Sequence, residues 1–162
     1  MTGFAARFGL EGRAALVTGA GRGIGRACTL ALAQAGAEVW LMARTKSEID
    51  DAAAEIRASG GKAHALACDV TNSDEMRQAV AAIPVLDVLV NNAGSNIPEP
   101  FVEVSEEHLD RLLALNVRAA AICRYIGVST KVGAMDSTRM PCVASSSAMA
   151  LVRPSRACLV RQ

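Results

Sequence analysis

Residues 18–25, TGAGRGIG, have a composition that could bind a phosphate group. The apolar run AALVT precedes them and the helically spaced segment RACTLALAQAG follows, so they lie where a predicted strand turns into a predicted helix. Glycines at such a turn let the backbone approach a pyrophosphate, and free N–H groups and the helix dipole receive its charge. The alternative is a tight turn that needs glycines for its geometry alone. The position between strand and helix favours phosphate binding.

Three asparagines occupy positions where an amide needs hydrogen-bonding partners. Asn91 and Asn92 end the apolar run VLDVLV, where an unpaired amide would cost about 1–3 kcal/mol. Asn116 falls inside a predicted helix, although asparagine is a poor helix former. We expect Asn91 and Asn92 to brace the end of their strand and Asn116 to make a specific hydrogen bond.

Tyr125 and Lys131 could form a proton-transfer pair only if their side chains meet. A lysine ammonium lowers the pKa of a phenol from about 10 when the two residues lie four apart on a helix. These residues are six apart, which is about 240° around a helix. Gly127 and Val128 also argue against a continuous helix here. We therefore do not expect a catalytic pair.

The elements that must position these residues alternate regularly over residues 1–121. Apolar runs predict strands at 14–18, 38–43, 64–70 and 85–90, and helical spacing predicts helices at 26–36, 47–61, 73–82 and 105–121. Ser47 and Ser105 are the expected N-caps of the second and fourth helices. The pattern predicts an α/β chain with a Rossmann-type doubly wound parallel sheet in three αβα layers. Its functional site should lie at the carboxyl ends of the strands.

Composition excludes several classes of function. The formal net charge is +1 with 20% charged residues, which argues against nucleic acid as a partner. The five cysteines are scattered without a CxxC pair, and neither His64 nor His108 has neighbouring ligands, so we expect reduced thiols and no metal site. The sequence has neither a membrane-length apolar run nor a signal-peptide pattern. We expect a cytoplasmic protein.

The character of the sequence changes after residue 121. Residues 1–121 carry 15 acidic and 11 basic residues, whereas residues 122–162 carry one acidic and six basic residues. Serine and cysteine become denser and the periodicities fade, except for a short predicted strand at PCVASS. We divide the chain into residues 1–121 and an atypical tail, 122–162. We hypothesise that the tail is an altered reading, such as a frameshift, or a degenerate segment.

Four motifs in order resemble the short-chain dehydrogenase/reductase family: TGAGRGIG, CDV at residues 68–70, NNAG at residues 91–94, and LNV around Asn116. TGAGRGIG fits the family's TGxxxGxG loop and not a strict GxGxxG, because Ile24 stands at the sixth place. The resemblance implies a nicotinamide dinucleotide and hydride transfer to or from a carbonyl or alcohol. The cofactor-binding residues that it implies are Thr18, Gly19, Gly21, Arg22, Gly23, Ile24, Gly25, Arg44, Asp69, Val70, Asn91, Ala93 and Gly94.

Charge favours NADP(H) over NAD(H). An acid closing the second strand would bind the adenosine ribose hydroxyls and repel a 2′-phosphate. This strand closes with Ala43 and Arg44 instead, and Arg22 adds a second cation in the glycine-rich stretch. Two guanidiniums would pair well with a phosphate. The alternative is that both arginines are solvated surface charges.

The catalytic half departs from the family pattern. By resemblance Asn116 would hold a water in a proton relay, and Ser147 would bind the substrate oxygen, with Ser145 and Ser146 as alternatives in register. The family's tyrosine, with a lysine four residues later, has no counterpart after these serines. We expect a truncated NADP(H)-dependent oxidoreductase whose sheet is incomplete and open at its C-terminal side and whose catalysis is impaired. A small carbonyl or alcohol would be its substrate and a second copy its family-typical partner. The alternatives are a non-catalytic dinucleotide-binding module and an unstable, inactive fragment.

Overall fold

The computed structural model describes residues 9–131, 142–145 and 148–152. Its centre is a sheet with the order β3-β2-β1-β4-β6-β5. The first four strands, β1 (Ala14–Thr18), β2 (Glu38–Ala43), β3 (Lys62–Ala67) and β4 (Val88–Asn91), pair in parallel. The predicted Rossmann-type sheet of parallel strands is confirmed.

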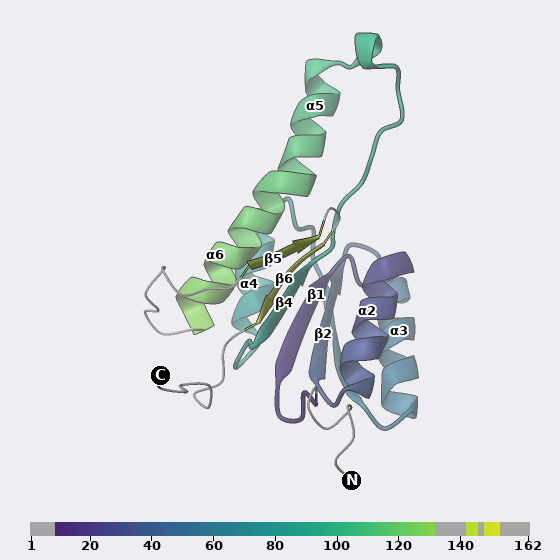
Figure 1. Cartoon of the computed structure of the whole chain (residues 1–162), viewed down its shortest axis with the longest axis vertical. Helices are drawn as coiled ribbons and strands as arrows, with labels where there is room; N and C mark the ends of the chain where they lie inside the picture. Colours follow the sequence, from purple (N-terminus) through teal and green to yellow (C-terminus); the bar gives the residue numbers. More distant parts are fainter. Residues whose placement is uncertain (1–8, 132–141, 146–147, 153–162) are drawn as a thin grey trace, which may run out of the picture.

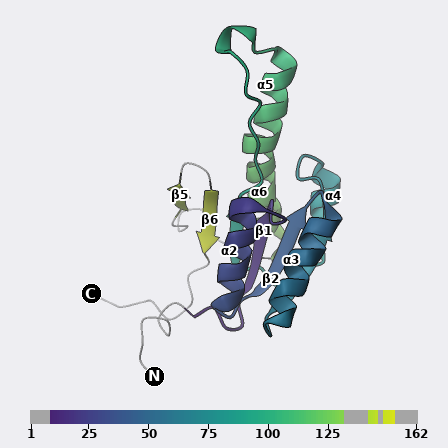
Figure 2. The same cartoon turned by 90° about the vertical axis from the view of Figure 1, so that its right-hand side faces the viewer.

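Helices cover both faces of this sheet. On one face Ala15, Val17, Val39 and Leu41 pack against α2 (Gly23–Gln34) and α3 (Lys46–Ala58). On the other face the alternate residues, Leu16, Trp40 and Met42, pack against α4 (Ser73–Ala81) and α6 (Ala119–Lys131). This alternation along each strand follows from the two-residue period of a pleated sheet. The predicted layers are therefore present, as Figures 1 and 2 show.

A long, continuous helical segment, here called the rod, projects from the sheet. It consists of α5 (Glu106–Leu113), a π-helical turn η2 (Ala114–Arg118) and α6, and the 3₁₀ turn η1 (Phe101–Glu103) lies at its outer end. In Figure 1 the α5 end projects well beyond the sheet. Because α6 continues to Lys131, the expectation that Gly127 and Val128 break the helix is wrong. The division at residues 121 and 122 stays a prediction, and α6 runs across it.

The strands of the tail form a hairpin. The predicted strand in PCVASS is present as β5 (Cys142–Ser145), but β6 (Ala148–Val152) lies between it and β4 and pairs antiparallel with both. Two strands joined by only two residues can pair in no other way, because a parallel connection needs a long crossover. The hairpin covers the edge of β4 and makes β5 the outermost strand on this side of the sheet, within the described residues.

The structure tests the two N-caps that were predicted from the sequence. Ser105 caps α5, its hydroxyl accepting the His108 N–H at 3.1 Å, as expected. The predicted cap at Ser47 is wrong, because α3 begins two residues earlier with Thr45 as its N-cap. Among the described residues, no helix is long and apolar enough to cross a membrane.

Candidate dinucleotide-binding site

The glycine-rich loop closes tightly between β1 and α2. Gly19 and Gly23 have φ values of 66° and 56°, in the left-handed region that favours glycine. A Cβ on Gly25 would lie 2.1 Å from the Gly19 carbonyl oxygen, so the first helical turn needs a residue without a side chain there. A Cβ on Gly23 would meet no described atom within 4 Å, so that glycine faces open space. Gly19 and Gly25 thus allow the tight turn, and Gly23 leaves space in which a ligand could approach the backbone.

The amino end of α2 has no protein acceptor for its amides within the described chain. Arg22 is the N-cap, makes no side-chain cap hydrogen bond, and is followed by no acid in the first turn. A helix start leaves its first N–H groups without intrahelical acceptors, and the helix dipole adds partial positive charge. The cradle therefore fits a pyrophosphate, which would supply the missing acceptors.

Thr18 joins the loop to the end of β4. Its buried hydroxyl accepts the N–H groups of Asn92 at 3.1 Å and Ala93 at 3.0 Å and donates to the Val90 carbonyl at 3.4 Å. The Asn92 amide donates in return to the carbonyls of Thr18 and Gly19, at 3.1 Å and 3.2 Å. The predicted bracing by Asn92 is confirmed, and its amide also holds the first residue of the glycine-rich loop.

Asn91 makes a weaker connection. Its Nδ2 donates to the Ala120 carbonyl of α6 at 3.4 Å, while its Oδ1 is buried and finds no donor among the described residues. An unsatisfied buried acceptor costs about 1–3 kcal/mol. Asn91 therefore braces its strand with one end of the amide, and the buried Oδ1 at the other end has no donor within the described chain.

Asn116 and Ser95 hold each other through two hydrogen bonds. The Asn116 Oδ1 accepts the Ser95 N–H and its Nδ2 donates to the Ser95 carbonyl, each at 2.9 Å. A Cβ on Gly94 would lie 2.9 Å from the same Oδ1, so Gly94 permits this contact. The predicted specific hydrogen bond of Asn116 is confirmed. Its partner Ser95 escaped the sequence analysis, in which the only signal was its place directly after NNAG.

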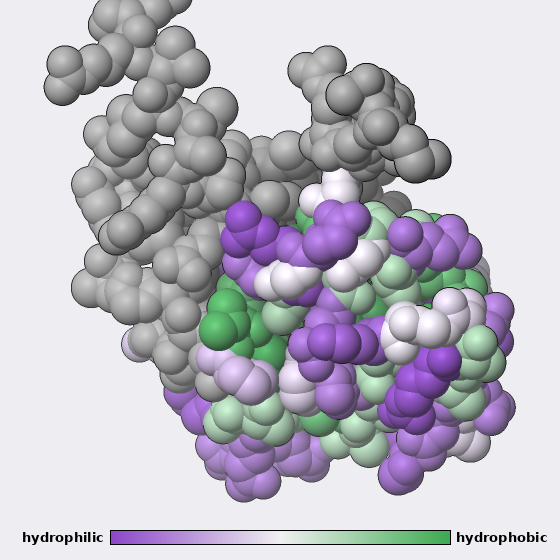
Figure 3. Space-filling model, turned by 90° about the horizontal axis from the view of Figure 1, so that it is seen from below, coloured by the Kyte–Doolittle hydropathy of each residue, from purple (hydrophilic) through white to green (hydrophobic). Residues whose placement is uncertain are grey.

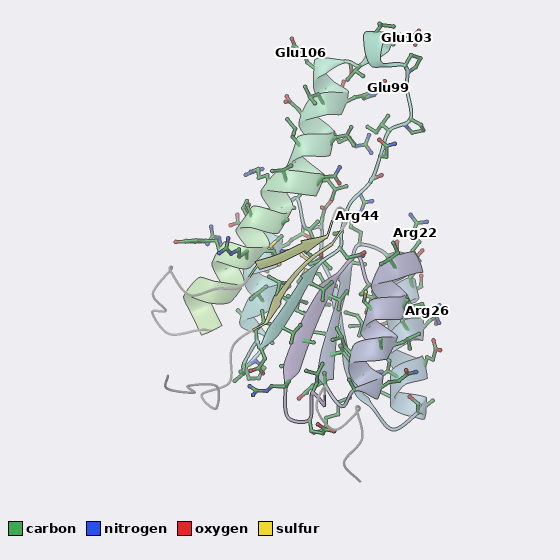
Figure 4. The ribbon with its side chains drawn as sticks, in the orientation of Figure 1. Arg22, Arg26, Arg44, Glu99, Glu103 and Glu106 are labelled. Atoms are coloured by element: carbon green, nitrogen blue, oxygen red, sulfur yellow. The ribbon has the colours of Figure 1, made fainter. Side chains whose placement is uncertain are left out.

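Two guanidiniums lie at the same end of the sheet as the loop. Both arginines, Arg22 and Arg44, are exposed, and their guanidinium groups make no hydrogen bond or ion pair within the described residues. Figure 4 shows Arg44 above the strand ends and Arg22 at the neighbouring end of α2. Burial would raise the pKa of the nearby Asp69, but two hydrogen bonds from Thr71 and the charge of Arg44 outweigh it and lower that pKa. Arg44 therefore has a carboxylate in electrostatic reach and no direct partner.

The other predicted residues lie around the same edge. Ile24 is 64% exposed at the start of α2, an unusual place for an isoleucine. Val70 is buried in the core, so only its backbone could meet a ligand. Ala93 and Gly94 follow the Thr18 brace directly. The loop, the end of β4 and the CDV turn thus meet at one edge, as the carboxyl ends of parallel strands do.

The catalytic serine prediction falls partly outside the structure. Ser147 and Ser146 are not among the described residues, whereas Ser145 ends β5 in register with Ala148. Met149 of β6 stands opposite Asn91. Because β6 lies between β5 and β4, Ser145 is two strands away from β4 and not in the strand that pairs with it. Tyr125 is 65% exposed on α6 and lies six residues from Lys131 on the same helix.

Three cysteines, Cys28, Cys68 and Cys123, are free thiols. Burial, with the charges of Glu75 and Asp69, raises the pKa of Cys68 to about 11, and burial with Cys68 raises the pKa of Cys123 to about 12. Such thiols stay protonated at neutral pH and react slowly. In the part of the chain described, histidine, cysteine and acidic residues form no group that could hold a metal ion.

A cavity of about 770 Å³ lies at the opposite, amino-terminal edge of the sheet. Figure 3 views this lower side, where hydrophilic and hydrophobic residues intermingle. Two of the charges that line it, Arg13 and Asp87, neutralise each other at 2.9 Å. The carboxyl edge instead offers open amides and guanidiniums without direct partners, so it is the better candidate for an anionic ligand.

Known proteins resemble this chain over the part that contains the site. A family model described as short chain dehydrogenase matches residues 13–138. An uncharacterized oxidoreductase of Mycobacterium tuberculosis (strain CDC 1551 / Oshkosh) is 42% identical over 70% of this chain and 44% of its own length. L-xylulose reductase of Mus musculus is 41% identical over 68% of this chain and 44% of its own. The chain thus spans less than half of these curated relatives.

Solved structures extend the likeness to three dimensions. One from Beutenbergia cavernae, assigned as an NAD(P)-dependent gluconate 5-dehydrogenase and holding NADP at low occupancy, has a TM-score of 0.70 and 37% identity. The alignment covers 75% of this chain and 50% of that one.

Proposed function

The chain belongs to the short-chain dehydrogenase family, and we propose that it binds NADP(H) at the carboxyl edge of its sheet. The observation that carries this proposal is the uncapped start of α2 beside Arg22. Open amides there suit the pyrophosphate. When bound, the nicotinamide would supply the hydride for reducing a carbonyl or accept one from an alcohol.

NADP(H) is proposed over NAD(H) because of the charges near the adenosine ribose. Arg44 follows β2 directly, and neither its guanidinium nor that of Arg22 makes a hydrogen bond or ion pair within the described residues. A 2′-phosphate would give both guanidiniums an anionic partner, whereas a ribose hydroxyl would not. The bound NADP of the Beutenbergia cavernae protein supports the choice by analogy.

We propose that catalysis by this chain is impaired. Asn116 holds Ser95, in the segment that follows β4. In the proposed reaction Asn116 would also order a water for proton transfer. Residue 129, four places after Tyr125, is a serine and not the lysine of the family pattern. Tyr125 stands on an exposed face, outside the loop, β4 and CDV cluster. Efficient turnover of a small carbonyl would therefore need groups beyond this set.

A second copy of the chain is the proposed partner. Four exposed side chains at intervals of four or eight residues form one apolar stripe along α5, η2 and α6: Leu109, Leu113, Val117 and Tyr125. Acidic Glu106 and Glu107 begin the rod and Arg118 lies further along it, so antiparallel rods would bring opposite charges together. Sedimentation should show a dimer, and Leu113→Glu should shift it toward the monomer. Free cysteines remain compatible with the proposed cytoplasmic location.

Calorimetric titration with NADPH and NADH, alongside a carbonyl-reduction assay, tests the proposal. We expect NADPH to bind more tightly than NADH and turnover to be slow but measurable. Efficient turnover would contradict the impaired catalysis, and tighter NADH binding would contradict the roles of Arg22 and Arg44. Aggregation without binding would favour an inactive fragment. Binding with no turnover of any carbonyl would favour a non-catalytic dinucleotide-binding module.

A further inference from the structure

A carboxylate rests directly on the phosphate loop. Glu48, in the first turn of α3, is half-buried. A Cβ on Gly21 would lie 2.6 Å from the Glu48 Oε2 and 2.8 Å from the Glu48 Cβ. The Glu48 side chain therefore occupies the space that a side chain at position 21 would take. It packs onto the backbone of the loop proposed to receive the dinucleotide.

Helix capping does not explain the position of Glu48. Thr45 and Glu48 have the spacing of a capping box, in which the glutamate would accept the N–H of the N-cap residue. The Thr45 side chain makes no cap hydrogen bond, and Glu48 makes no hydrogen bond or ion pair within the described chain. Two other acids of α3 have partners: Asp50 pairs with Lys46, and Glu55 pairs with Arg26 at 2.6 Å.

Glu48 is linked to both arginines that we propose to hold a 2′-phosphate, through a contact with the residue before Arg22 and through its place in the chain after Arg44. Arg22 is the chain neighbour of Gly21, which Glu48 contacts, and Arg44 lies four residues before Glu48 at the end of β2. Arg22 is the N-cap of α2, Arg44 lies in the connection from β2 to α3, and Glu48 lies in the first turn of α3. An anion that binds there meets two positive charges and one negative charge.

We propose that Glu48 is a specificity-determining residue that opposes a phosphate on the adenosine ribose and so narrows the preference for NADPH over NADH. The inference rests on the proposed function. Arg22 and Arg44 attract the phosphate, and Glu48 repels it. A dinucleotide without that phosphate gains less from the cations and loses less to the carboxylate.

Isosteric neutralisation separates this role from a structural one. In Glu48→Gln the packing on Gly21 is kept and the charge is removed. We expect NADPH to bind about three- to tenfold more tightly, the range for one partly solvated charge beside another, while the Kd for NADH changes less than about twofold. Added salt should shrink the difference between wild type and Glu48→Gln.

Two variants serve as controls. Glu48→Asp keeps the charge, so its NADPH to NADH affinity ratio should stay within about twofold of wild type. Asp51→Asn removes a charge from the exposed side of the same helix and should leave the ratio unchanged. Circular dichroism would establish that all variants are folded before isothermal titration calorimetry with NADPH and NADH.

The outcomes distinguish this inference from the proposed function. If wild type binds NADPH but Glu48→Gln leaves the ratio unchanged, or strengthens both dinucleotides equally, the inference is wrong and the proposed function stands. An equal gain in Asp51→Asn would also overturn it, because a general charge effect would then suffice. If wild type binds neither dinucleotide, the proposed function fails and the role of Glu48 fails with it.

Discussion

Replacing Thr18 by valine should loosen the connection between the glycine-rich loop and β4 with almost no change in side-chain volume. The Thr18 hydroxyl is the acceptor for the N–H groups of Asn92 and Ala93, at 3.1 Å and 3.0 Å. Valine has the same shape but offers no oxygen. Both amides would then lose their acceptor in a part-buried place.

The cost can be worked from these two bonds. Each amide left unsatisfied costs about 1–3 kcal/mol, and the upper end is reduced here because water reaches part-buried groups. We therefore expect Thr18→Val to lose about 2–4 kcal/mol of unfolding free energy. At about 2–4 °C per kcal/mol for a chain of this size, the midpoint of thermal unfolding should fall by about 4–16 °C.

Thr18→Ser is the matched control, since it removes a methyl group and keeps the hydroxyl. Urea denaturation would give the unfolding free energies, and calorimetry would give NADPH affinity, which should fall for Thr18→Val as the loop loosens. If Thr18→Val and Thr18→Ser differ by less than about 0.5 kcal/mol, the two hydrogen bonds do not brace the loop.

Three further variants test other contacts and the burial of Cys123. Gly25→Ala would put a Cβ 2.1 Å from the Gly19 carbonyl oxygen, so we expect NADPH titration to show at least tenfold weaker binding, whereas near-native affinity would contradict the tight loop. Asn116→Ala should speed amide hydrogen exchange at Ser95, and unchanged protection would show that the two 2.9 Å bonds are not what holds it. The pKa of Cys123 is raised from 9.0 to about 12, so its contribution to stability is complete below pH 9.0 and is lost as pH rises toward the folded value. The midpoint of thermal unfolding, measured across that pH range, should fall less steeply with pH in Cys123→Ala than in wild type. Parallel plots of the midpoint against pH would refute this.

The sheet and its loop could be predicted because their signals are local. Glycines after an apolar run indicate a turn whatever surrounds it, and the structure shows the left-handed φ values of Gly19 and Gly23. The amides at the end of β4 likewise had to find partners. That Asn92 would find the loop carbonyls, and Asn91 a carbonyl of α6, depended on contacts distant in sequence.

Other features depend on tertiary packing and escaped the sequence. Gly127 lowers helix propensity, but Ile126 is buried in the core beside it and α6 continues. Propensity is a weak prior against such packing. β6 had no clear alternation, and its place beside β4 follows from pairing with a strand distant in sequence. Glu48 was an ordinary first-turn acid in the sequence, and its contact with Gly21 exists only once α2 and α3 lie side by side.

Amide hydrogen exchange with and without NADPH tests most directly the claim that the dinucleotide binds at the carboxyl edge. We predict that NADPH slows exchange at residues 19–25 and at Arg44, and leaves Gly60 and Gly61 at the amino-terminal cavity unchanged. Protection confined to Gly60 and Gly61, with the glycine-rich loop unaffected, would contradict the account.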